Sequence, residues 1–249
     1  MTAAPRIQAS GLAVGQGQRP VQRDLDFAVH TGRIFVVMGP SGCGKSTLLK
    51  CMIGLVPPLA GQLCYDGEDF WCCGPERRRA LGRRIGVLFQ GGALWSGMTL
   101  AENVALPIRL YTRLTAKAAA ELACFKLAQV GLTGFEDFVP ATVSGGMRRR
   151  AGLARAMALD PDILFLDEPS AGLDPPAARR LDELVLELRA SLGMTVVMVS
   201  HDLASIFAVA DDALYLDPDT GTAIAQGSPH QLLDEGDERV RDFLGGGGR

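Results

Sequence analysis

The stretch that most constrains this chain is VVMGPSGCGKST, residues 36–47, in which an apolar run, a glycine-rich loop and a helix start follow one another. Gly39, Gly44, Lys45 and Ser46 satisfy the spacing G-x-x-x-x-G-K-[ST] in full. Such glycines let backbone N–H groups point at a phosphate, and the positive end of the helix dipole adds to the attraction. The alternative is a glycine turn with an incidental lysine, which the strand before it and the helix after it disfavour.

We therefore expect ATP or GTP to bind at this loop. Lys45 would bring a positive charge to the β and γ phosphates, and the Ser46 hydroxyl can bind Mg²⁺. The predicted nucleotide-binding residues are Gly39, Pro40, Ser41, Gly42, Cys43, Gly44, Lys45, Ser46 and Thr47.

Two carboxylates follow another apolar run, in DILFLDEPSAGLD at residues 162–174. Asp167 suits the Mg²⁺-linked aspartate of a P-loop enzyme. Glu168 would then be free to act as general base toward an attacking water. A solvated acidic turn is the alternative for such a pair in isolation, and the phosphate loop elsewhere in the chain disfavours it.

Two more polar residues end apolar runs in the same way. His201 follows residues 195–200, and Gln90 follows residues 85–89. We expect His201 to contact the γ-phosphate or the water, and Gln90 to reach Mg²⁺ or the water; a structural histidine and a polar strand cap are the alternatives. The predicted catalytic residues are Glu168, His201 and Gln90, and the predicted metal ligands are Ser46, Gln90 and Asp167.

Short apolar runs alternate with helical patterns along the chain. Continuous apolar runs favour strands buried on both faces, as in a parallel sheet covered by helices. The alternation predicts an α/β fold with a mostly parallel sheet, the P-loop NTPase (RecA-like) core. The expected strands are 34–38, 85–89, 162–166, 195–200 and 213–216, and the expected helices include 45–54, 177–192 and 203–210.

Two segments depart from this alternation. Residues 6–30 predict a small N-terminal antiparallel β element, because apolar and polar residues alternate there around a glycine turn. Residues 95–158 lack strand-like runs and look helical, most clearly at 115–131, where Thr115 can cap the helix and Gly131 can end it. We predict one domain, 1–249, with a core of about 1–90 and 159–249 and an inserted helical subdomain of about 91–158.

Residues 143–156, VSGGMRRRAGLARA, place two glycines and three arginines ahead of a helical pattern. Glycine inside a helix costs about 1 kcal/mol relative to alanine, so Gly145 and Gly146 do not serve helix stability. They suit a helix start, where bare backbone N–H groups bind anions. These residues alone leave open which anion binds there.

Composition excludes several other classes. The net charge of −3 over 249 residues argues against a protein whose main function is to coat nucleic acid. Its six cysteines form no C-x-x-C pair and lie near no histidine, which favours a reducing cytosol over a disulfide framework or a zinc site. The N-terminus lacks a signal-peptide core and no apolar stretch approaches about 18 residues, so we expect no membrane span.

Taken together, the motifs resemble those of the ATPase subunits of ABC transporters over nearly the whole chain. In order they are the phosphate loop at 39–46, Gln90 at the Q-loop, VSGGM at the signature, ILFLDE at Walker B, AGLD at the D-loop and His201 at the switch histidine. The resemblance implies that ATP with Mg²⁺ is bound, and that the signature faces ATP held by a second copy. By this likeness Ser144, Gly145 and Gly146 would contact that ATP, and Asp174 would connect the two sites.

A narrower resemblance is to the MCE-associated phospholipid-trafficking (Mla-type) ATPases. It rests on SGGMRRRAGLARAMALDPDILFLDEP, on residues 89–109 and on the terminal ERVRDFL. It implies a homodimer on the cytoplasmic face of the inner membrane, with integral membrane permease subunits and an MCE-domain lipid-binding protein as partners and no nucleic acid. The chain departs from the family where an aromatic residue normally stacks on adenine, because Val14 or Leu12 stands there.

Two classes of function stay open at this point. In a transport motor, Leu94, Trp95 and Leu100 within residues 91–111 would line a groove for a permease helix, although ordinary packing is the alternative for each. The second class is a soluble ABC ATPase that transports nothing, and another importer or exporter is a further alternative. Small-molecule kinases lack the SGG signature, and ribosome-associated ABC proteins usually carry two ATPase halves in one chain.

The C-terminal segment carries a short apolar stripe. Val240, Phe243 and Leu244 stand at i, i+3 and i+4, after a helix that Ser228 is expected to cap. An isolated helix below about 12 residues is marginal in water, so the stripe must dock. The chain's own core and a partner subunit are both open as the surface on which it docks.

Overall fold

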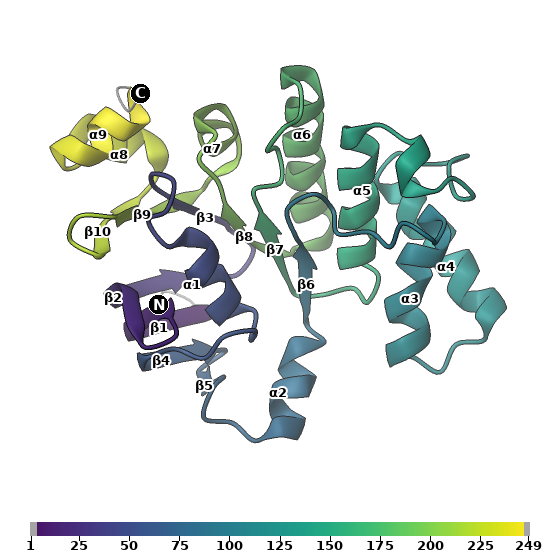
Figure 1. Cartoon of the computed structure of the whole chain (residues 1–249), viewed down its shortest axis with the longest axis horizontal. Helices are drawn as coiled ribbons and strands as arrows, with labels where there is room; N and C mark the ends of the chain where they lie inside the picture. Colours follow the sequence, from purple (N-terminus) through teal and green to yellow (C-terminus); the bar gives the residue numbers. More distant parts are fainter. Residues whose placement is uncertain (1–3, 247–249) are drawn as a thin grey trace.

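The computed structural model describes residues 4–246, whose strands form two sheets (Figure 1). The larger sheet has the order β10-β9-β3-β8-β7-β6 and is parallel except for the pair β9 and β10. The predicted α/β fold with a mostly parallel sheet is confirmed. The strands are β3 (Ile34–Met38), β6 (Ile85–Leu88), β7 (Ile163–Asp167), β8 (Thr195–Val199), β9 (Asp212–Asp217) and β10 (Thr222–Gly227).

The smaller sheet is antiparallel, with the order β2-β1-β4-β5. β1 (Ile7–Gln16) and β2 (Arg19–Val29) form the predicted N-terminal element. β4 (Ala60–Tyr65) and β5 (Glu68–Asp69) add two strands that the sequence did not predict. Their residues, AGQLCY and ED, carry too few apolar side chains to show a strand pattern, and pairing with β1 makes β4 a strand.

The two faces of the parallel sheet bury separate apolar clusters. In β3, Val36 faces one cluster and Val37 the other, as expected for a strand covered on both sides. Helix α1 (Lys45–Met52) packs on the face shared with the antiparallel sheet. The opposite face is covered by α5 (Gly145–Ala156), α6 (Pro175–Leu192) and α7 (Leu203–Val209).

The segment between β6 and β7 is helical, apart from loops, as predicted. It contains α3 (Leu100–Tyr111), α4 (Ala116–Gln129), the short 3₁₀ helix η1 (Pro140–Thr142) and α5. The Thr115 hydroxyl caps α4 by accepting from the Ala118 amide at 3.2 Å, and Gly131, with φ +68°, follows its end. Figure 1 shows these helices at the end of the molecule away from the antiparallel sheet. The exact subdomain boundaries stay a prediction.

Three short helices complete the described chain. Helix α2 (Pro75–Gly82) leads into β6, while α8 (Pro229–Glu235) and α9 (Glu238–Leu244) lie beside β9 and β10 (Figure 1). No helix among residues 4–246 is long and apolar enough to cross a membrane. All six cysteines are free thiols.

The C-terminal stripe docks on the chain's own core. Val240 and Leu244 are 0% and 3% exposed within the larger apolar cluster. The Phe243 ring meets that of Tyr215 edge-on, with 5.3 Å between centroids, and Ser228 caps α8 as predicted. Of the two docking surfaces left open by the sequence, the structure selects the intramolecular one.

Truncating this stripe should therefore cost stability. We expect Leu244→Ala to lower the free energy of unfolding by about 2–5 kcal/mol, because a buried leucine leaves a cavity. Thermal denaturation measures the loss, at about 2–4 °C per kcal/mol for a chain of this size. Asp242→Ala, an exposed position on the same helix, is the control. If the Leu244→Ala protein melts like wild type but fails to self-associate, the stripe docks on the partner subunit instead.

Candidate functional site

Four neighbouring strands end at one edge of the parallel sheet, and each carries a predicted polar group. β3 leads into the phosphate loop, β8 to His201, β7 to Asp167 and Glu168, and β6 to Gln90. Val37 and Asp167 both pair with Val199 of β8, which brings these strand ends into register. Ligands of open α/β sheets bind outside the carboxyl ends of the strands, and this edge is therefore the candidate site.

The phosphate loop wraps around the Lys45 side chain. The Lys45 ammonium is buried and donates to the Gly39 carbonyl at 2.8 Å and to the Pro40 carbonyl at 2.9 Å. Gly39 has φ +142°, and a Cβ there would lie 2.5 Å from the Leu216 carbonyl oxygen, so no other residue fits. Ser41, Gly42 and Ser46 are exposed on the outer side of this loop. The loop thus presents a positive charge inside a curve of free backbone amides.

A buried glutamine that the sequence did not single out fixes this loop. Gln22 of β2 is 0% exposed, and its amide donates to the Cys43 carbonyl at 2.7 Å and to the Asp217 carbonyl at 3.0 Å. Because polar residues alternate with apolar ones along β2, the sequence did not distinguish Gln22 from the exposed polar residues of this strand. Gln22 ties the phosphate loop to both β2 and β9.

Glu168 and His201 form a pair. Their Oε1 and Nδ1 atoms lie 2.8 Å apart, with the glutamate side chain 12% and the histidine 54% exposed. Glu168 has φ +47°, a left-handed conformation that costs a non-glycine residue about 1–3 kcal/mol and is typical of functional sites. The structure therefore gives His201 a carboxylate partner that spacing alone did not predict.

Asp167 is half-buried beside this pair. Its Oδ1 atom is buried and has no hydrogen-bond partner among the described residues. Burial, and after it the charge of Glu168, raise the pKa of Asp167, while the charges of Lys50, Lys45 and Arg149 oppose that rise. A bound cation would satisfy the free oxygen and favour the ionised carboxylate.

The remaining predicted metal ligands are accessible to a hard cation. Ser46 and Gln90 are both exposed, at the start of α1 and after β6. Residues 4–246 contain no cluster of three or more His, Cys, Asp or Glu side chains suited to a metal. A single carboxylate with hydroxyl and amide oxygens fits Mg²⁺, which usually keeps several waters and shares its ligands with phosphates.

The signature segment opens α5 as predicted. The Ser144 hydroxyl caps the helix by accepting from the Met147 amide at 3.2 Å. A Cβ added at Gly145 or Gly146 would meet its nearest neighbours at 3.6 and 3.5 Å, which is ordinary van der Waals contact. Packing within this chain therefore does not require glycine at either position. Close approach of a group from outside the chain would explain why both residues are glycine.

A cavity of about 250 Å³ adjoins this helix start, and Ser144, Gly146 and Asp174 line it together with Arg150 and Arg180. The Asp174 carboxylate caps α6 by accepting from the Ala177 amide at 2.8 Å. Because α5 and α1 lie on opposite faces of the sheet, the signature and the phosphate loop belong to different surfaces of one chain.

Three residues that the sequence analysis singled out are buried in the structure. Leu12 and Val14 are 0% and 1% exposed in the core, so neither can stack on a base. Leu100 is also fully buried and cannot line a groove, because it begins α3 on its inward face. Trp95 is 62% exposed, as a docking residue would be, whereas Leu94 packs against the core.

An apolar groove does exist, but on other residues. A cavity of about 640 Å³ lies between the β6 side of the core and α3, and its lining includes Val87, Phe89, Leu106, Leu110 and Tyr111. Leu110 and Tyr111 are 66% and 54% exposed. The Arg83 guanidinium lies 5.6 Å from the Tyr111 ring centroid, and Arg79 adds a second positive charge to the rim.

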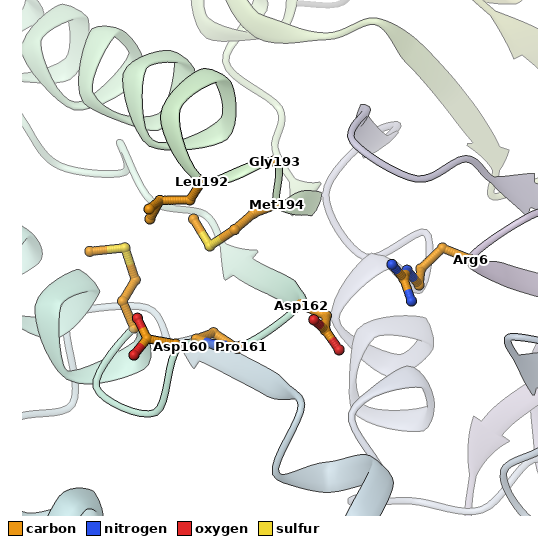
Figure 2. A pocket seen from close by; sticks show the side chains of 8 residues that line it. Arg6, Asp160, Pro161, Asp162, Leu192, Gly193 and Met194 are labelled. Carbon is orange, nitrogen blue, oxygen red and sulfur yellow. The ribbon is translucent and has the colours of Figure 1, made fainter.

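A smaller cavity, of about 180 Å³, lies at the opposite, amino end of the strands (Figure 2). Met194, Pro161 and Asp160 line it, and Arg6 and Asp162 stand at one side. Arg6 and Asp162 at this cavity already form ion pairs: Arg6 binds Asp66 at 2.9 Å, and Arg84 binds both Asp66 and Asp162. We assign this end of the sheet a structural role.

The sequence profile of the ABC transporter family matches residues 22–171, which carry the phosphate loop, Gln90, the signature and both carboxylates. The chain belongs to the ABC transporter family. It is an ATP-binding, ATP-hydrolysing subunit of this family, and its fold agrees with solved ATP-binding cassettes. One of them, a dimer in a post-hydrolysis state bound to ADP and phosphate, has a TM-score of 0.80 and 26% identity, with coverage of 89% of this chain and 98% of the other.

Curated relatives of this ABC subunit match over nearly the whole chain. The intermembrane phospholipid transport system ATP-binding protein MlaF of Haemophilus influenzae is 40% identical over 96% of this chain and 90% of its own. The "Probable ribonucleotide transport ATP-binding protein mkl" of Mycobacterium bovis is 37% identical over 96% of this chain and 66% of its own.

The position of the Lys45 ammonium generates a direct test. Lys45→Ala should weaken ATP binding about 10- to 100-fold, since hydrogen bonds to a charged group contribute about 1.5–3 kcal/mol. ATPase activity should fall with it while the melting temperature stays near wild type. Titration with a fluorescent ATP analogue measures the affinity, and Lys117→Ala, 89% exposed on α4, is the control. If Lys45→Ala binds ATP with wild-type affinity, the phosphate loop is not the nucleotide-binding site.

Proposed function

We propose that two copies of this subunit close around two ATP molecules and hydrolyse them to drive a membrane permease that moves phospholipid. The observation that carries the chemistry is the Glu168–His201 pair, held at 2.8 Å at the carboxyl edge of the sheet. A carboxylate that is nearly buried, strained and hydrogen-bonded to an exposed imidazole suits a general base that acts on water.

In this proposal each polar group at the edge has one task. Lys45 and the loop amides of residues 39–47 hold the β and γ phosphates of ATP. Glu168 accepts a proton from the attacking water, and His201 orients the Glu168 carboxylate and faces the γ-phosphate. Gln90 contacts the water or the metal from the neighbouring strand.

Asp167, Ser46 and Gln90 would hold Mg²⁺. The unpartnered Oδ1 atom of Asp167 supports this assignment, because a buried carboxylate oxygen needs either a donor or a cation. When bound, Mg²⁺ neutralises charge on the phosphates. Burial and the charge of Glu168 raise the pKa of Asp167, and the positive charges of Lys50, Lys45 and Arg149 oppose that rise.

The signature supports a second copy as the missing half of the site. Gly145 and Gly146 leave the start of α5 bare, although their own chain leaves room for a side chain. We infer that this surface, Ser144 included, approaches the γ-phosphate held by the partner, with Arg150 and Arg180 adding positive charge nearby. Asp174, on the same cavity, would connect the two sites.

The groove beside α3 is the proposed seat for the permease. Its apolar floor and the exposed Leu110 and Tyr111 fit an amphipathic helix, and the arginine rim fits acidic residues on that helix. This placement replaces the predicted groove around Leu94, Trp95 and Leu100. The proposed location, supported by the identity to MlaF, is the cytoplasmic face of the inner membrane.

Phospholipid is the proposed cargo, supported by the 40% identity to MlaF over nearly all of both chains. An MCE-domain lipid-binding protein is then the expected further partner. Ribonucleotides are the second candidate, because a relative described for their transport is 37% identical.

Glu168→Gln separates binding from hydrolysis. The amide keeps the size of the side chain and a hydrogen bond but cannot accept the proton, so hydrolysis should slow about 10²- to 10⁴-fold. ATP should still bind, and an ATP-stabilised dimer should accumulate in size-exclusion chromatography. Glu183→Gln, an exposed glutamate on α6, is the control. A Glu168→Gln protein with normal turnover would move the base elsewhere, first to His201.

A groove variant tests the permease and the cargo together. The subunit should co-purify with an integral membrane permease from its own cells, and phospholipid bilayers should stimulate the ATPase of this complex where ribonucleotides do not. Leu110→Glu should weaken this complex about tenfold or more, as expected when a charge enters an apolar anchor site. Leu55→Glu, at a leucine that is 60% exposed and does not line the groove, is the matched control. Equal loss in both variants would contradict the groove assignment.

A further inference from the structure

A buried polar cluster lies behind the Glu168–His201 pair and takes no part in the function proposed above. Ser205 Oγ lies 2.8 Å from Asp182 Oδ2 and 3.2 Å from Asp202 Oδ2, and Ser170 Oγ lies 3.3 Å from Asp202 Oδ2. Asp182, Ser205 and Ser170 are 6%, 1% and 5% exposed. The cluster joins α6, α7 and the loop that follows β7.

This cluster connects the two loops that carry the proposed catalytic pair. Ser170 follows Glu168 by two residues, and Asp202 follows His201 directly. Asp202 also caps α7 by accepting from the Ala204 amide at 3.1 Å, and its own amide donates to the Ser200 hydroxyl at 3.1 Å. The position of Asp202 therefore sets where the His201 backbone lies relative to Glu168.

The contacts around Ser205 require one more proton than a serine supplies. A hydroxyl has one hydrogen to donate, and an ionised carboxylate can only accept. Ser205 lies between Asp182 and Asp202, so both contacts are hydrogen bonds only when one carboxyl is protonated. Asp202 already accepts from the Ala204 amide and from the Ser170 hydroxyl. Asp182 is buried, and within residues 4–246 its carboxyl group contacts Ser205 and forms no ion pair, so below its pKa Asp182 carries the proton.

We propose that Asp182, as a carboxylic acid, is a positioning residue of this ATPase. Asp182 donates to Ser205, Ser205 donates to Asp202, and Asp202 holds the His201 loop against the loop that follows Glu168. This proposal rests on the proposed roles of Glu168 and His201. When Asp182 loses its proton, the Ser205 hydrogen turns to Asp182, Asp202 loses a donor, and the two carboxylates repel each other.

The surroundings of Asp182 place this change in an accessible pH range. Burial raises the pKa of Asp182 to about 6, although its hydrogen bond with Ser205 opposes the rise. A cavity of about 410 Å³, lined by Asp182, Asp202 and Ser205, gives protons a path from solvent. The other charged groups on this cavity are Arg179 and Glu183 of α6, both exposed.

The protonation is tested first by stability, without any catalytic readout. A carboxyl with a folded pKa of about 6 and an unfolded pKa of about 3.9 binds a proton more tightly in the native state. Its stabilising contribution is full below the unfolded pKa and is lost as pH rises to about 6 and above. Asp182→Asn has no titrating proton there and keeps a donor toward Ser205.

The melting temperature of Asp182→Asn relative to wild type should therefore rise between pH 4.5 and pH 7.5. A two-unit pKa difference corresponds to a change of roughly 100-fold in the ratio of the unfolding equilibrium constants over the whole titration, of which roughly 25-fold falls between pH 4.5 and pH 7.5. Glu183→Gln, on the same cavity but exposed, should show no such trend. A constant difference between Asp182→Asn and wild type across this range overturns the protonated carboxyl.

The positioning role is tested by kcat at saturating MgATP as a function of pH. Asp182→Asn should match wild type near pH 5.5 and exceed it several-fold at pH 7.5, where wild-type Asp182 is ionised. Ser205→Ala removes the relay, so adding Asp182→Asn to it should change nothing. If the ratio of kcat between Asp182→Asn and wild type does not change with pH while the stability trend appears, the positioning role alone is overturned. If the wild-type protein has no ATPase activity, the proposed function is overturned and the stability result still stands.

Discussion

The site depends on the parallel pairing of β3, β8, β7 and β6 in register. Parallel strands end at the same edge of a sheet, so each strand delivers its following residues to one line in space. The phosphate loop, His201, the two carboxylates and Gln90 come from segments up to about 160 residues apart in the chain and meet only there. A shift of one residue in any pair would turn the predicted site residues to the wrong face.

Around this edge, the fold uses buried polar groups to hold loops that apolar packing cannot hold. Gln22 fixes the phosphate loop through two carbonyls, and Arg149 of the signature helix donates to the Ala171 carbonyl at 2.7 Å, next to Walker B. The Asp182 cluster does the same for the His201 loop. Burying each of these polar groups costs desolvation free energy. Their hydrogen bonds are directional and fix the orientation of the loops, which apolar contacts do not do.

The surfaces away from this edge point to assembly. The signature helix lies on the opposite sheet face from the phosphate loop, so one nucleotide cannot bridge both within a chain. The groove at Leu110 and Tyr111 lies between α3 and the β6 side of the core, and its lining residue Phe89 directly precedes Gln90. Hydrolysis at one surface and docking at another are the two functions that a transport motor must link.

The sequence by itself determined the parallel strands β3, β6, β7, β8 and β9, the phosphate loop and the two acidic residues after β7, because each depends on short-range pattern: apolar runs, glycine spacing and caps. It also predicted the start of α5 at Gly145. Only the tertiary structure decided which face each side chain occupies. Leu100 was predicted to line a groove and is buried, and the C-terminal stripe docks on its own core. Asp182 of α6 has no distinguishing sequence pattern, yet it contacts Ser205 of α7. Burial and pairing between distant segments are properties of packing, and local sequence does not encode them.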